Sequence, residues 1–174
     1  MITNGDRSRL AFGGLIAVLI TSALAACAGG SSTPSGPEPR QDPGLYMAAV
    51  VREKILGDYA LAWESLYPAH KRVAPRREYV SCESKAPFPG LLERIRVVKV
   101  ADEPVRVAGV RRKLPSKAVT VRVIARNPFL DRPAVVDHTF HAIAVAGRWT
   151  WILTPQRFED YRAGYCPSAQ GQAT

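Results

Sequence analysis

The residues best suited to acid–base chemistry lie on one short segment in the second half of the chain. Asp137, Thr139 and His141 follow one another at intervals of two, so a β-strand would place them on one face. There the Asp137 carboxylate could orient His141 as a general base in a pocket. Polar residues on the solvent face of a half-exposed strand have the same spacing, and we favour that interpretation.

The sequence contains few other residues with catalytic or metal-binding spacing. His138 and His141 would point to opposite faces of a strand, so they cannot share a metal ion. His70 stands in a polar segment beside Lys71 and Arg72, which we expect to be a loop. The chain has no HExxH motif, Cys–His cluster, GxSxG motif or Gly-rich phosphate loop. We therefore expect neither a metal site nor a cofactor.

The N-terminal residues have the pattern of an export signal. Arg7 and Arg9 precede an uncharged stretch over residues 10–26, which is a basic region followed by an apolar core. The stretch runs into Leu24-Ala25-Ala26-Cys27, which resembles the lipobox of bacterial lipoproteins. The resemblance implies that the Cys27 sulfur carries a diacylglyceryl group and that the chain is cleaved before this residue.

The same resemblance divides the chain and implies its location. Residues 1–26 would be a lipoprotein signal peptide, and the protein would be lipid-anchored at the extracytoplasmic face of the cell membrane. An uncleaved signal anchor or ordinary signal cleavage would also place the domain outside the cytoplasm. Residues 28–43 contain four Pro, three Gly and three Ser, so we interpret residues 27–43 as the lipidated cysteine and a disordered tether. A single domain over residues 44–166 and a flexible tail over 167–174 follow.

Two cysteines remain once Cys27 is assigned to the lipid. Cys82 and Cys166 are the one possible pair in an oxidising compartment. Neither has a CxxC partner or a setting typical of a nucleophile. We therefore predict a structural disulfide that joins the end of the domain to its helical part.

The expected order of elements is helices first and strands afterwards. A helical face is formed by Ala48, Val51, Ile55, Tyr59, Ala62 and Leu66. Gly57-Asp58 interrupts it, with Asp58 as the N-cap of a second helix that ends before Pro68. A third helix is expected over residues 75–84. Strands are expected over residues 95–100, 105–110, 118–125, 135–145 and 148–154, followed by a helical turn over 156–163. The tight Ala146-Gly147 link makes the last two strands hairpin neighbours.

This order predicts an α+β domain with N-terminal helices packed on a curved antiparallel sheet. The helix break at Gly57-Asp58, the Trp63…Tyr67-Pro68 run and the late Gly147-Arg148-Trp149-Thr150-Trp151 hairpin resemble the nuclear transport factor 2-like superfamily. The resemblance implies a cone-shaped α+β fold. A cystatin-like arrangement of helix on sheet is the alternative.

The tryptophans allow a ligand-binding interpretation. Trp149 and Trp151 would share one face of their strand and could line an apolar ligand pocket. Ordinary core packing has the same pattern, and we favour it for these two residues and for Trp63.

The chain of 174 residues has a formal charge of +9. Such a charge would suggest nucleic acid for a cytoplasmic protein, but outside the membrane we expect no nucleic-acid partner. A basic face near anionic lipid and a merely solvated surface remain equally open. Taken together, the sequence predicts a non-enzymatic binding or accessory module for a hydrophobic small molecule or an envelope protein partner. A pocket enzyme that uses Asp137 and His141 is the alternative.

Overall fold

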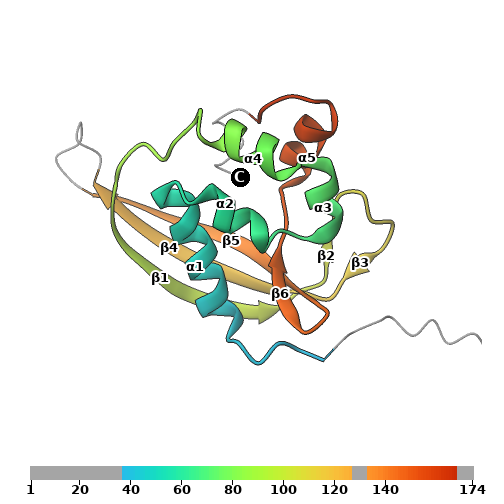
Figure 1. Cartoon of the computed structure of the whole chain (residues 1–174). Coiled ribbons are helices and arrows are strands. Elements are labelled where there is room, and N and C mark those ends of the chain that lie inside the picture. The colour runs from blue at the N-terminus through green and yellow to red at the C-terminus, as the bar shows by residue number, and fades with distance from the viewer. Residues whose placement is uncertain (1–36, 127–132, 168–174) are drawn as a thin grey trace, which may run out of the picture. The chain divides into compact units, whose positions relative to one another are not determined.

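Helices come first along the chain and strands follow, with one last helix near the C-terminal end (Figure 1). The computed structural model describes residues 37–126 and 133–167. Its helices are α1 (Pro43–Leu56), α2 (Tyr59–Glu64), α3 (Pro68–Val73), α4 (Arg76–Glu83) and α5 (Pro155–Arg162). Its strands are β1 (Leu91–Asp102), β2 (Val105–Arg106), β3 (Lys113–Leu114), β4 (Lys117–Arg126), β5 (Ala134–Val145) and β6 (Arg148–Trp151). The predicted α+β class with an antiparallel sheet is confirmed.

Helix α1 has well-defined signals at both ends. The Asp42 side chain accepts a hydrogen bond from the backbone N–H of Leu45 at 2.8 Å, which satisfies a donor that the helix leaves free. Gly57 ends the helix in the left-handed region, at φ 85°. Helix α2 begins after Asp58, as predicted, but the Asp58 side chain makes no capping hydrogen bond.

Two segments differ from their predicted structure. The polar stretch of His70, Lys71 and Arg72, which we expected to be a loop, lies in helix α3, and His70 is fully buried there. The strand predicted over residues 105–110 is reduced to the two residues of β2, which pair with β3. Val107 is buried instead, and Gly109 turns the chain at φ 76°, so the backbone cannot continue as an extended strand.

The main sheet has the strand order β1-β4-β5-β6 and is antiparallel throughout. Strand β1 carries two register irregularities, between Leu92 and Arg94 and between Val97 and Lys99, which bend and twist a strand. The free edge of β6 is covered, because the backbone N–H of Trp151 donates a hydrogen bond to the backbone carbonyl of Ser65. Strand β1 forms the other edge of the sheet, and no strand of the described residues pairs with its outer side.

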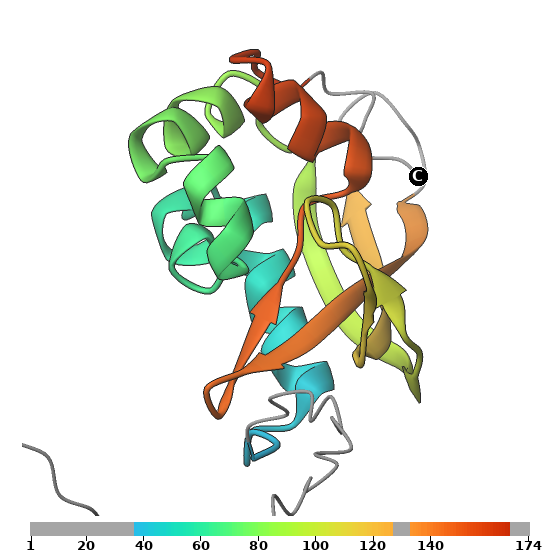
Figure 2. The same ribbon diagram turned by 90° about the vertical axis from the view of Figure 1, so that its right-hand side faces the viewer.

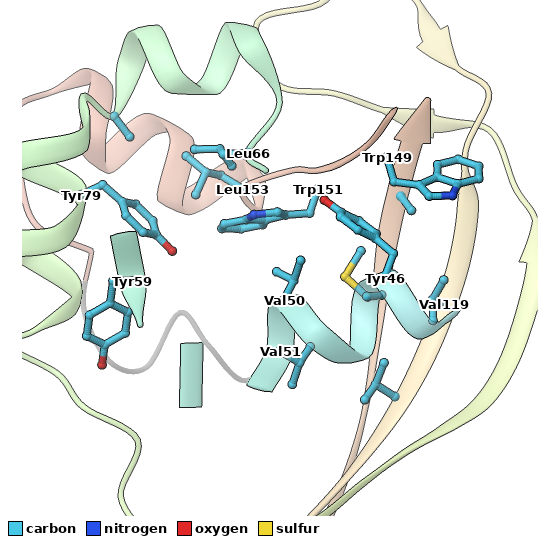
Figure 3. Packing of buried hydrophobic residues seen from close by; sticks show 14 of the residues in the cluster. Tyr46, Val50, Val51, Tyr59, Leu66, Tyr79, Val119, Trp149, Trp151 and Leu153 are labelled. Carbon is cyan, nitrogen blue, oxygen red and sulfur yellow. The ribbon is translucent and has the colours of Figure 1, made fainter. Parts of the chain in front are cut away.

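One face of the sheet packs against the helices (Figures 1 and 2). Its side chains alternate along β4, where Val119, Val121 and Val123 are buried and their partners in β1 and β5 share that face. Figure 3 shows how the aromatic rings of this core, among them Tyr79 and Trp151, fill the space between helices and sheet. We call this face the inner face and the opposite one the outer face.

The ends of the domain are also defined. Ala146 and Gly147 both have positive φ, 49° and 73°, as a type I′ hairpin turn requires, and β5 pairs with β6 as predicted. Ahead of α1, the carbonyl of Gln41 accepts a hydrogen bond from Trp149 Nε1 at 2.7 Å. Contacts with the domain therefore reach into the segment that we expected to be tether. Among the described residues, no helix combines the length and apolar character needed to cross a bilayer.

Candidate functional site

Asp137 and His141 both lie on the outer face of β5, but each has another partner. The Asp137 carboxylate accepts two hydrogen bonds from the Arg122 guanidinium of β4, from Nε to Oδ1 and from Nη2 to Oδ2, both at 2.7 Å. These bonds lower the pKa of Asp137. His141 Nδ1 lies 3.0 Å from the Ser116 hydroxyl. The carboxylate is therefore engaged with a cation and is not orienting the imidazole.

His141 is half-buried where the connection between β1 and β4 reaches the outer face. Burial lowers the pKa of its imidazole, while the charge of Glu103 acts in the opposite direction. Between His141 and Asp137, the hydroxyls of Thr120 and Thr139 lie 2.9 Å apart. These two hydroxyls bond to each other across neighbouring strands, so the segment behaves as the exposed polar face of a sheet.

Trp149 and Trp151 lie in the core on the inner face of β6, with 5% and 4% of their surfaces exposed. The Trp151 indole N–H donates to the carbonyl of Ala62 at 2.7 Å, and that of Trp149 donates to Gln41. A buried indole needs such a partner. Both rings thus pack as core residues, and Trp149 also borders a surface hollow of about 710 Å³ beside residues 37–41.

A buried charged cluster between α4 and α5 was missed by the sequence analysis. Glu83 in α4 accepts hydrogen bonds from the Arg157 guanidinium and, at 2.8 Å, from the Tyr161 hydroxyl, both in α5. Glu83 and Arg157 are 3% and 5% exposed. Tyr79 and Glu83 are four residues apart in the sequence, as are Arg157 and Tyr161, which puts each pair on one helix face. That spacing was the available signal, but it could not reveal which helices meet.

Lys54 of α1 approaches this cluster, with its ammonium 4.9 Å from the centre of the Trp151 ring. Burial lowers the pKa of Lys54 to about 7, and the positive charge of Arg157 adds to the effect. The π face of Trp151 attracts a cation and so works against that shift. Two polar atoms in the described part of the cluster have no hydrogen-bond partner, the Tyr79 hydroxyl and Arg157 Nε.

His70, which we expected in a loop, is a structural residue. Its Nδ1 accepts a hydrogen bond from the backbone N–H of Leu153 at 2.9 Å. Its Nε2 therefore carries the proton and donates to the carbonyl of Ala108 at 3.2 Å. Burial lowers the pKa of His70. The neutral ring joins α3 to the segment after β6 and to the turn that follows β2.

Cys82 and Cys166 lie together in a disulfide, with their sulfur atoms 2.10 Å apart. The bond joins α4 to the segment after α5. It borders a hollow of about 360 Å³ that also contains Arg77 and Lys85, and Lys85 Nζ lies 3.8 Å from Cys166 Sγ. Cys27, the predicted lipid attachment site, lies outside the described residues.

The positive charge is concentrated in the segment from β1 to β4. Residues 91–126 contain ten basic and three acidic side chains, a formal charge of +7 out of +9 for the whole chain. The β1 register places Arg94, Arg96 and Lys99 on the outer face, opposite Ile124, Arg122 and Thr120 of β4. All three β1 residues are exposed, and within residues 37–126 and 133–167 none of them forms an ion pair.

Comparisons with known proteins assign the chain to no family. No family model matches the chain, and no curated protein sequence matches it. Within the described parts of the chain, no three His, Cys, Asp or Glu residues come together as a metal site would require. Over the described residues, the structure defines an α+β domain whose apolar core lies between the helices and one face of the sheet, while the other face carries exposed side chains.

Proposed function

We propose that the chain is a lipid-anchored protein of the cell envelope, held at the extracytoplasmic face of the membrane through Cys27. Its folded domain acts as a non-enzymatic binding or accessory module. The support for the anchor is the sequence itself, with a basic region, an apolar core and Leu24-Ala25-Ala26-Cys27 in succession. The support for the module is the outer face of the sheet.

The outer face is the observation that carries the proposed binding role. Helices α1 to α4 lie on the inner face (Figure 2), whose core is densely occupied by aromatic and aliphatic side chains. The outer face instead presents long side chains such as Arg96 and Arg122 toward solvent. A broad exposed surface of this kind suits a partner with an extended binding surface better than a hydrophobic small molecule, which needs a concave apolar pocket.

For the fold family, we propose a nuclear transport factor 2-like domain. The long first helix, the break at Gly57, and the final hairpin of β5 and β6 support this assignment. A cystatin-like fold is the alternative. An enzyme that uses Asp137 and His141 is a less favoured function, since the two side chains are bonded to Arg122 and Ser116.

Mass spectrometry of the membrane-extracted protein tests the anchor. We expect the mature chain to begin at Cys27 and to carry the mass of a diacylglyceryl group. A Cys27→Ser variant is the control and should remain unmodified. An N-terminus at another residue, or a Cys27 without added mass, would contradict the anchor.

Crosslinking in native envelope membranes tests the binding role. A photoreactive amino acid at Thr139 on the outer face should form crosslinks to a component of the envelope, and more of them than the same group at a control position. The matched control places the same group at Leu61 of α2, which is 58% exposed but belongs to the helical layer. Equal crosslinking from both positions would argue against a specific role for the outer face.

A further inference from the structure

We infer that the outer face of the sheet, together with the β2–β3 hairpin, docks on the anionic headgroups of a lipid bilayer. This inference rests on the proposed lipid anchor and names the surface that the anchored domain turns toward the membrane. The face is formed by the outward side chains of β1, β4 and β5, and its cations Arg94, Arg96 and Lys99 form no ion pair with any residue that the structure describes. Three observations favour the bilayer as the partner of this face.

The first ground is the sign of the charge. The one outer-face carboxylate of β5, Asp137, is neutralised by Arg122 through two hydrogen bonds, so the cations of β1 are not opposed by it. The β2–β3 hairpin adds Arg111, Arg112 and Lys113, which are exposed. Close to an anionic membrane each basic side chain strengthens attachment roughly fivefold, so three outer-face cations contribute about 100-fold.

The second ground is the contrast with the helical layer. Residues 43–90, which contain α1 to α4, carry seven basic and five acidic side chains, a formal charge of +2. The strands and connections of residues 91–126 carry +7 over fewer residues. An anionic plane therefore attracts the segment of β1, the β2–β3 hairpin and β4 more strongly than the segment of helices α1 to α4.

The third ground is the place where the N-terminal segment joins the domain. Lys117 Nζ, at the start of β4, lies 3.1 Å from Glu38 and 2.8 Å from Asp102 at the end of β1. The chain thus enters at the end of the sheet from which the β2–β3 hairpin also arises. The ten residue steps from Cys27 to Pro37 can span at most about 35 Å. An anchored domain stays this close to the headgroups, so even weak attraction holds it there.

The exposed side chains of the outer face suit a headgroup layer. Val135, which lies opposite Ile124, is 58% exposed, and the paired hydroxyls of Thr120 and Thr139 are polar but uncharged. Scattered apolar groups among cations can enter the boundary of headgroups and acyl chains without the long apolar stripe of an inserted helix. A second copy of this chain is a poor partner for the face, because Arg94, Arg96 and Lys99 would meet like charges.

The test is lysine footprinting of the anchored full chain in lipid nanodiscs. The discs contain phosphatidylcholine alone, or phosphatidylcholine with phosphatidylglycerol, and a water-soluble acetylating reagent is followed by peptide mass spectrometry. We expect acetylation of Lys99 and Lys113 to slow by about fivefold or more in the anionic discs. Lys85, which is exposed in the segment after α4, is the internal control and should react equally in both. In about 1 M NaCl, where the screening length is about 3 Å, the protection should disappear.

Variants with matched charge changes strengthen the test. Arg94→Gln with Arg96→Gln should abolish the protection of Lys99, while Arg72→Gln with Arg77→Gln in the helical layer should leave it intact. Loss of protection in both variants, or none in the unmodified chain, would overturn the docking proposal. Protection in native envelope membranes but not in protein-free anionic discs would assign the face to an acidic protein and also overturn it. A chain that is not retained in the discs overturns the anchor and the docking together, whereas a retained but unprotected chain overturns the docking alone.

Discussion

The buried ion pair between α4 and α5 allows the sharpest test of how this domain is held together. Arg157 and Glu83 have almost no solvent to stabilise their charges, so each depends on the other. Replacing Glu83 by Met would leave the guanidinium buried without a counter-charge, and Arg157 Nε already has no hydrogen-bond partner among the described residues. We expect this variant to lose about 3–5 kcal/mol of unfolding free energy.

The double variant distinguishes pairing from mere packing. With both Glu83 and Arg157 replaced by Met, no buried charge remains, and such replacements are often neutral or stabilising. The double variant should therefore be more stable than either single variant. The control is Glu159→Met, which breaks the exposed pair between Arg162 and Glu159 and should cost less than about 1 kcal/mol.

Urea unfolding followed by tryptophan fluorescence measures the unmodified chain, the two single variants, the double variant and the Glu159→Met control, all with the disulfide intact. The comparison requires that the slope of the free energy against urea stays the same. If the losses of the two single variants simply add in the double variant, the pair is not coupled. That result would refute the assignment of Glu83 and Arg157 as mutually dependent charges.

Three further perturbations have defined outcomes. Cys82→Ala with Cys166→Ala should lower the free energy of unfolding, and with it the urea midpoint. The upper estimate of this loss is about 4–5 kcal/mol, from the sequence separation of 84 that the bond spans; an unchanged midpoint contradicts this. The pKa of His70 is lowered by burial, so below pH 6.5 the unfolded chain takes up a proton that the folded chain refuses. Stability should then fall with decreasing pH by up to about 1.4 kcal/mol per unit, and His70→Gln should remove that part of the slope in a pH series of urea unfolding curves. Gly109→Ala should destabilise more than Gly147→Ala, because only its new methyl group meets a buried ring, at 2.9 Å; both have positive φ, and equal thermal midpoints would exclude the clash.

The elements that the sequence predicted well are those with a strong local signal. The periodic apolar face of α1 and its stop at Gly57, and the Ala146-Gly147 turn between β5 and β6, both depend on neighbouring residues. Helix α3 was missed because six residues cannot form a stable helix by themselves. It exists because His70 is held by hydrogen bonds from distant parts of the chain.

The candidate site likewise combines features that the local sequence predicts with features that depend on distant contacts. That Asp137 and His141 share a strand face followed from their spacing. That Asp137 would bond to Arg122 did not, because this depends on the register between β4 and β5, and a one-residue slip moves every side chain to the other face. The cation pattern of β1 was readable as sequence, but its position on an open face required the strand order.

The last strand and the last helix have a consequence for the order in which the domain can form. Strand β6 closes the sheet edge through Trp151, which bonds to the segment between α2 and α3. Helix α5 then supplies Arg157 to Glu83, and only afterwards does Cys166 reach Cys82. A chain emerging from its N-terminus would expose the helical layer, with an unpaired carboxylate and a free thiol, until nearly the whole sequence is available. We therefore expect a chain truncated shortly before β6 to remain incompletely folded. Proteases should cleave it readily, and its Cys82 thiol should form disulfides with thiols other than Cys166.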